Sequence, residues 1–197
     1  MKLVIASNNS KKRNEIEAIL GTLGIEILPA ARTVHVEVEE DAESFAGNAR
    51  KKAEAFAAAN QCAALADDSG LCVDALDGAP GIYSSRFAGA SASDADNNAK
   101  LLHEMSGVKL RTAHFNCAIC LSLPDGRSLL AEGRVDGEIG LSQSGSHGFG
   151  YDPLFYSPEL GKVFADSSAE EKASVSHRGR ALKRLRDILS TSDVLND

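Results

Sequence analysis

The spacing of apolar residues predicts a chain in which strands and helices alternate. Apolar runs of strand length lie at residues 2–7, 25–30, 112–123 and 128–139. The last two runs flank Pro124-Asp125-Gly126, a turn sequence that predicts a hairpin between them. Early strand–helix alternation followed by a long hairpin predicts the α/β class, with a mixed sheet flanked by helices and two lobes around one sheet.

Helices are expected where apolar side chains recur three and four positions apart or where strong helix formers accumulate. Residues 42–60 are rich in Ala and contain no Pro, which favours one long helix. Gly24 is expected to end the first helix, Ser93 to cap a central helix, and a single C-terminal helix is expected from Ala169 onward. The apolar stripe of the first helix consists of Ile16, Ile19, Leu20 and Leu23. That of the central helix consists of Leu101, Leu102 and Met105, and that of the C-terminal helix of Leu182, Leu185, Ile188 and Leu189.

Two adjacent carboxylates, Asp67 and Asp68, interrupt an apolar pattern at residues 63–76, which predicts two short strands that meet at this pair. Burial of an unpaired carboxylate costs several kcal/mol, so the pair needs a partner. Mg²⁺ suits this need, because it takes one or two carboxylates together with phosphate oxygens and waters. Adjacent side chains diverge on a strand, so one of the two is expected to face the ligand. The alternative is a solvent-exposed turn built on Asp68-Ser69-Gly70.

A polar loop, SNNSKK at residues 7–12, joins the first strand to the first helix. At such a junction the backbone N–H groups and the helix dipole favour a bound phosphate. Ser7 and Asn9 add donors, and Lys12 adds a positive charge. The spaced glycines of a Walker loop are missing, so an ordinary capped helix start is the alternative.

Two further segments hold candidate ligand contacts. Gly148 and Gly150 flank Phe149, so the backbone there can approach a ligand closely and the ring can stack on a base. The alternative for this segment is a bulge around a core phenylalanine. Three basic residues lie in or beside the C-terminal helix and are either ligand contacts or structural groups on a solvated face: Lys172, His177 and Arg178.

Composition limits the classes of function. The 197 residues are 43% hydrophobic and 25% charged, as in globular proteins, and the net charge of −7 argues against a nucleic-acid partner. No signal segment or membrane-spanning length is visible, so a cytoplasmic location without a membrane partner is expected. The four cysteines lie in apolar surroundings. Cys117 and Cys120 are three apart on an expected strand and face opposite ways, which favours buried, reduced thiols over a zinc site.

Five segments together resemble the non-canonical purine nucleoside triphosphate pyrophosphatases, also called inosine/xanthosine triphosphate pyrophosphatases. They occur in the family's order between Ser7 and Leu182: SNNSKK, VEEDAESFAGNARKKA, ADDSGLCVDALDGAPGIYSSRFAG, GFGYDPLF and EEKASVSHRGRAL. The resemblance implies one two-lobed domain over residues 1–197, with a central substrate cleft. It also implies hydrolysis of ITP, dITP and XTP to the nucleoside monophosphate and pyrophosphate, with Mg²⁺ as cofactor, in a homodimer.

The resemblance also assigns roles to residues of this chain. Asp68 matches the general base and a metal ligand, with Asp67 beside it in support, and Glu40 matches a second metal ligand. The positions that match substrate contacts are Ser7, Asn8, Asn9, Ser10, Lys11, Lys12 and Lys52 on the phosphate side, and Phe149, Gly150, Tyr151, Asp152, Lys172, His177 and Arg178 on the base side. Ser69 matches a further substrate-contact position.

Two alternatives stay open from the sequence. One is a pyrophosphatase of related fold that acts on other modified nucleotides, including pyrimidines; the purine side of the site would distinguish it. The other is a nucleotide sensor that binds without turnover. The metal-site residues Glu40, Lys52 and Asp68 argue against a sensor, because a pure binding protein has less use for them.

Overall fold

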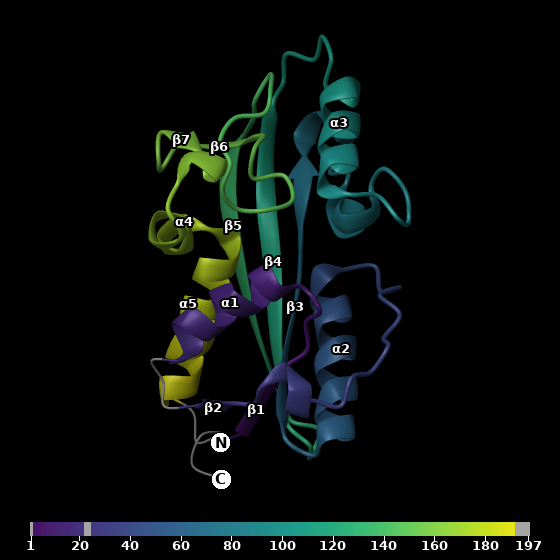
Figure 1. Ribbon diagram of the computed structural model, residues 1–197, viewed down its shortest axis with the longest axis vertical. Helices are drawn as coiled ribbons and strands as arrows, with labels where there is room; N and C mark the ends of the chain where they lie inside the picture. The colour runs from purple at the N-terminus through teal and green to yellow at the C-terminus, as the bar shows by residue number, and fades with distance from the viewer. Residues whose placement is uncertain (1, 22–24, 192–197) are drawn as a thin grey trace. The chain divides into compact units, whose positions relative to one another are not determined.

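The structure, a computed structural model, describes residues 2–21 and 25–191. It contains a seven-stranded sheet in the order β2-β1-β3-β4-β5-β6-β7 (Figure 1). The strand β1 pairs in parallel with β2 and β3, whereas β6 pairs antiparallel with β5 and β7. The sheet is therefore mixed, and with its flanking helices it confirms the predicted α/β class.

The element bounds follow the predicted order. The strands are β1 Lys2–Ile5, β2 Glu26–Ile27, β3 Ala63–Val73, β4 Thr112–Ser122, β5 Ser128–Ile139, β6 Phe155–Ser157 and β7 Lys162–Val163. The helices are α1 Ser10–Leu20, α2 Phe45–Asn60, α3 Asp94–Glu104, α4 Ala169–Val175 and α5 His177–Thr191. The hairpin between β4 and β5 and the Ser93 cap of α3 are confirmed.

Three predicted boundaries were wrong. The acid pair does not separate two strands but lies within β3, because both carboxylates find partners without a turn. The long helix starts at Phe45 rather than 42, where the Ser44 side chain accepts a hydrogen bond from the Gly47 N–H. The C-terminal segment forms two helices, since Ser176 has extended dihedral angles (φ −67°, ψ 156°). The expected helix residues Leu23 and Gly24 lie outside the described residues.

The chain divides into two compact units. Unit 1 comprises Met1–Asp68, Cys117–Gly133 and Arg178–Asp197, and unit 2 comprises Ser69–Asn116 and Arg134–His177. The strands β3, β4 and β5 each contribute residues to both units.

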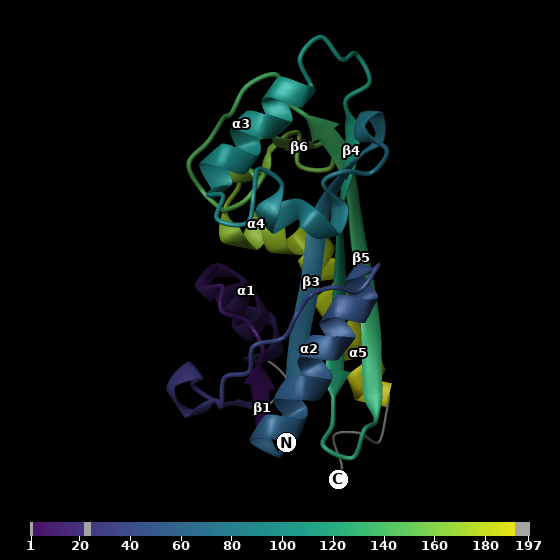
Figure 2. The same cartoon turned by 90° about the vertical axis from the view of Figure 1, so that its right-hand side faces the viewer.

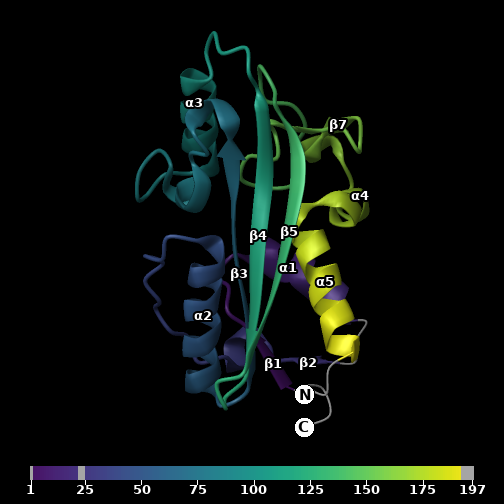
Figure 3. The same ribbon diagram turned by 180° about the vertical axis from the view of Figure 1, so that it is seen from behind.

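In unit 1, helices cover both faces of the sheet. One face packs against α1 and α5, and the other packs against α2, as Figures 2 and 3 show from two sides. Successive residues of β3 alternate between these faces: Ala63 and Leu65 contact the α1/α5 side, and Ala64 and Ala66 contact the α2 side. The same alternation places Asp67 on the α1/α5 side of β3 and Asp68 on the α2 side.

Unit 2 has its own core on one face of its strands. Aromatic rings dominate it: Phe115, Phe155 and Phe164 pack with centroid separations of 4.7 to 6.2 Å. The helix α3 adds Leu101 to this core, and its C-cap residue Met105 adds a second side chain. The opposite side of β5 in this unit is exposed and polar at every second residue, which is the period of a strand with one buried face.

Two further observations bear on the sequence-based expectations. Cys117 and Cys120 are buried in different core clusters on opposite faces, and burial raises the pKa of the Cys117 thiol to about 12, so this thiol stays protonated. No helix within the described residues is long and apolar enough to cross a membrane.

Candidate active site

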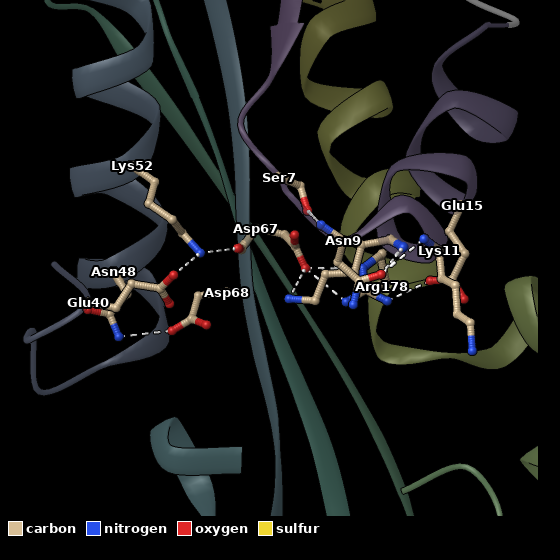
Figure 4. A network of polar contacts seen from close by, with 11 residues as sticks. Ser7, Asn9, Lys11, Glu15, Glu40, Asn48, Lys52, Asp67, Asp68 and Arg178 are labelled. Carbon is tan, nitrogen blue, oxygen red and sulfur yellow. Dashed lines mark hydrogen bonds and ion pairs between the residues drawn. The ribbon is translucent and has the colours of Figure 1, made fainter. Parts of the chain in front are cut away.

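The acids Asp67 and Asp68 lie in the middle of β3 and point to opposite sides of the strand (Figure 4). Asp67 continues the face that packs on α1 and α5, and Asp68 continues the face that packs on α2. Both side chains are buried, with residue exposures of 1% and 7%. Each therefore depends on groups supplied by the helices that cover its own face.

Asp67 is surrounded by positive charge. Its Oδ2 accepts hydrogen bonds from Nε and Nη2 of Arg178 at 3.1 and 2.8 Å, and lies 3.2 Å from Nζ of Lys12. Burial alone would raise the pKa of Asp67, but the charges of Lys12, Arg178 and Lys52 outweigh it and hold the pKa below its usual range. Asp67 is therefore charged and pairs with the side chains of Arg178 and Lys12.

Arg178, at the start of α5, joins this acid to a second one. Its Nη1 donates to Oε2 of Glu15 on α1 at 2.5 Å, and the residue is only 2% exposed. Burial opposes the charged form, but Asp67 leads the acids that raise the pKa of Arg178. Sequence reasoning missed Glu15, and nothing in its position on an amphipathic helix distinguishes it from a solvated carboxylate.

The SNNSKK loop lies between β1 and α1, as expected. Asn9 is the N-cap of α1, and its Oδ1 accepts hydrogen bonds from the N–H groups of Lys11 and Lys12 at 3.0 and 3.2 Å. The Asn9 N–H in turn donates to Oγ of Ser7 at 3.3 Å, while Asn8 and Ser10 are exposed. The capped helix start is therefore present: Asn9 satisfies the N–H groups of Lys11 and Lys12, and the positive end of the α1 dipole lies at this exposed N-terminus.

Asp68 has a different environment from Asp67. Its Oδ2 accepts a hydrogen bond from Nδ2 of Asn48 at 3.0 Å, and Oδ1 of Asn48 accepts the Ala42 N–H at 2.9 Å. Burial raises the pKa of Asp68, and the charge of Glu40 adds to this against the opposing effect of Lys52. Sequence reasoning missed Asn48, although a buried Asn inside an Ala-rich helix is a recognisable signal.

Glu40 and Lys52 lie on the same side as Asp68. Nζ of Lys52 donates to Oε1 of Glu40 at 3.1 Å and to the Asp67 carbonyl oxygen at 2.8 Å (Figure 4). Figure 4 shows Glu40 and Asp68 on the same side of β3, and the charge of Glu40 is one of the causes that raise the pKa of Asp68. No group of three or more His, Cys, Asp or Glu within the described residues could hold a metal by itself.

In unit 2, a buried ion pair supports the Gly-rich loop. Nζ of Lys172 on α4 donates to Oδ2 of Asp152 at 2.6 Å, and this oxygen also accepts the Phe149 N–H at 2.8 Å. The same ammonium lies 4.6 Å from the centroid of the Phe149 ring, which is half-buried. Gly148 has φ +77°, and a Cβ there would overlap Oδ2 of Asp152, so no other residue fits that position.

The remaining candidate substrate contacts are buried or half-buried. The Tyr151 hydroxyl donates to the Ser84 carbonyl oxygen at 2.9 Å, and burial raises its pKa. The His177 ring stacks on Phe115 with a centroid distance of 4.7 Å and an angle of 12°. Ser69, on β3, is half-buried. Within unit 2 the structure thus brings Phe149, Asp152 and Lys172 together, with Gly150 and Tyr151 in the same loop.

Comparisons with known proteins show the family of the chain. The sequence profile of the Ham1 family matches residues 3–188. A dITP/XTP pyrophosphatase of Exiguobacterium sp. is 50% identical over 190 residues, covering 94% of this chain and 95% of the relative. The Desulforamulus reducens protein of the same name is 50% identical over 193 residues, covering 96% of each chain.

A solved structure gives the same result for the fold. The structure of a HAM1 protein from Coxiella burnetii has a TM-score of 0.89 and 38% sequence identity, and the match covers 98% of this chain and 100% of that one. Sequence and fold agree over nearly the full length, and the chain belongs to the Ham1 family.

Proposed function

We propose that this protein hydrolyses non-canonical purine nucleoside triphosphates such as dITP, ITP and XTP to the nucleoside monophosphate and pyrophosphate. The names of relatives that are 50% identical over nearly their whole length support this substrate class. The observation that carries the chemistry is Asp68: a buried carboxylate whose pKa is raised by burial, held by Asn48 and beside a second carboxylate and a lysine.

Asp68 is proposed as the general base. A raised pKa makes a carboxylate a better proton acceptor near neutral pH. In the proposed step Asp68 takes a proton from water, the water oxygen bonds to the α-phosphorus, and the bond from the α-phosphorus to the bridging oxygen breaks with release of pyrophosphate. Lys12, Lys52 and the loop at residues 7–12 supply the positive charge and N–H donors that a triphosphate requires.

Glu40 and Asp68 are proposed to hold Mg²⁺. Two carboxylates fit this ion, because Mg²⁺ prefers oxygen ligands and completes its shell with water and substrate phosphates. When bound, the ion would neutralise charge on the phosphates and on the leaving pyrophosphate. Lys52 contacts Glu40 and would share that neutralisation.

On the base side, Phe149 is proposed to stack on the purine. The resemblance adds Lys172, His177 and Arg178, whose N–H groups would suit the O6 of hypoxanthine and xanthine and oppose the amino group of adenine. Exclusion of GTP would then depend on its 2-amino group. The contacts of Arg178 with Asp67 and Glu15 favour a structural role for this member of the set.

A homodimer is proposed from the same resemblance, and a cytoplasmic location from the free cysteines. Sedimentation or light scattering of the purified protein tests the assembly.

The decisive experiment is a turnover panel with ITP, dITP, XTP, ATP, GTP and dUTP in the presence and absence of Mg²⁺, with pyrophosphate as the readout. We expect Mg²⁺-dependent turnover of the first three and little of the others. Preferred turnover of dUTP would favour a pyrimidine enzyme. Binding of ITP without turnover would favour a sensor.

A further inference from the structure

The peptide after Phe149 is held by a helix that the proposed reaction does not use. Gly150 has φ +60° and Gly148 has φ +77°, so two glycines flank the ring. Glycine adopts this region of dihedral space at no steric cost, so the backbone on either side of Phe149 is freer than that of other residues. Asp152 holds the Phe149 N–H on one side, and the Gly150 peptide on the other side needs contacts of its own.

Two residues of α3 supply those contacts on both sides of Gly150. The Gly150 N–H donates to Oδ2 of Asp94 at 2.8 Å, and the Gly150 carbonyl oxygen accepts from Nδ2 of Asn98 at 2.8 Å. The same Nδ2 donates to the Asp94 carbonyl oxygen at 2.8 Å, so the two residues are also joined to each other. Asn98 is 2% exposed, which protects its hydrogen bonds from competing water.

The start of α3 is itself fixed. Ser93 and Asp96 form a capping box, in which the Ser93 Oγ accepts the Asp96 N–H and the Asp96 carboxylate accepts the Ser93 N–H. Asp94 and Asn98 lie four residues apart on this helix, hence on one side of it. Figure 2 shows the loop passing beside α3.

We propose that Asp94 and Asn98 are positioning residues for base recognition: they hold the Gly150 peptide so that the Phe149 ring keeps the direction in which it meets the purine. This inference rests on the proposed function, because it takes Phe149 as the base-stacking residue. Loss of either contact should weaken ligands that contain a base and leave ligands that contain only phosphate unchanged. Asn98 should matter more than Asp94, because Asp94 is exposed.

The test uses four variants of the full chain. Asn98→Ala and Asp94→Ala remove the two contacts, and Asp94→Asn keeps an oxygen acceptor for the Gly150 N–H. The matched control is Asp96→Ala, which breaks the capping box in the same helical turn but touches no residue of the loop. Three quantities are measured: the Kd of IMP by calorimetry, inhibition of ITP turnover by pyrophosphate, and amide hydrogen exchange of residues 148–152 without ligand.

We expect Asn98→Ala to raise the Kd of IMP roughly three- to tenfold and Asp94→Ala about two- to threefold, the range of a single hydrogen bond. Both should speed amide exchange in the loop and leave pyrophosphate inhibition unchanged. Asp94→Asn should have the same Kd of IMP as the wild type. Asp96→Ala should lower Tm and leave the Kd of IMP unchanged. Asp94 lies on the surface, so its variants should fold even if Asn98→Ala does not.

The proposal is overturned if Asp96→Ala weakens IMP as much as Asp94→Ala does, since helix stability would then explain the effect. Unchanged amide exchange in both Asp94→Ala and Asn98→Ala also overturns it. If the wild-type protein neither turns over ITP nor binds IMP, the proposed function fails, and faster exchange alone would still show that α3 holds the loop.

Discussion

The two sides of β3 present the same residue type in opposite settings. On the α1/α5 side, Asp67 meets Arg178 and Lys12, and its pKa is lowered. On the α2 side, burial raises the pKa of Asp68, although Asn48 donates a hydrogen bond to it. Two adjacent aspartates therefore have different proton affinities because the helices on either side of the sheet bring different partners.

This difference in pKa indicates a structural role for Asp67 and a catalytic role for Asp68. A carboxylate that is paired with buried cations is held in its charged form, whereas one whose pKa is raised by burial is a better proton acceptor. We therefore assign Asp67 to the support of α1 and α5, and propose Asp68 for the reaction. Substitutions on each side of β3 test this assignment.

The largest effect on turnover is expected from Asp68→Asn. The amide is isosteric but is not a base, so kcat should fall by about 10²- to 10⁴-fold, the range for loss of a general base. Steady-state turnover of ITP measures this, and an unchanged Tm shows that the fold is intact. A kcat within a few-fold of wild type would remove Asp68 from the reaction.

Asp67→Asn is expected to act on stability first. It leaves Arg178, which is 2% exposed, with less compensation for its buried charge, and breaking a buried ion pair costs about 3 kcal/mol or more. Urea unfolding at pH 7 measures the loss. If Asp67→Asn and Asp68→Asn are equally stable and equally inactive, the two acids do not differ as their surroundings indicate.

Glu40→Gln is expected to act through the metal. Loss of one carboxylate should raise the Mg²⁺ concentration for half-maximal turnover by about 10- to 100-fold, as seen when metal-site groups are altered. A Mg²⁺ titration of ITP turnover measures the shift, with Glu39→Gln as the neighbouring control. The same half-maximal concentration in wild type and Glu40→Gln would exclude Glu40 as a ligand.

The smallest effect is expected from Glu15→Gln, on the Asp67 side. Glu15 contacts Arg178, but its side chain is 28% exposed, and ion pairs with one partly exposed member contribute about 1 kcal/mol or less. Urea unfolding should show a loss well below that of Asp67→Asn. A loss as large as that of Asp67→Asn would make Glu15, rather than Asp67, the main partner of Arg178.

Much of the fold followed from local patterns. Apolar runs and turn chemistry located the β4–β5 hairpin, and Ser93 located the start of α3, because caps and turns are set by a few neighbouring residues. The division of the C-terminal helix at Ser176 and the short strands β6 and β7 were not predicted. Two- and three-residue strands carry no periodic signal and exist through their neighbours in the sheet.

That Asp67 and Asp68 face opposite ways follows from the sequence, since side chains alternate along a strand, and the motifs around them carry the family resemblance. The sequence could not determine their partners. Arg178 lies 111 residues from Asp67 and 163 from Glu15, and Asn98 lies 52 from Gly150. Such contacts depend on which helix covers which face, and that choice is made by the packing of the whole unit. The proton affinity of each acid, and hence its proposed role, was therefore decided only by the tertiary structure.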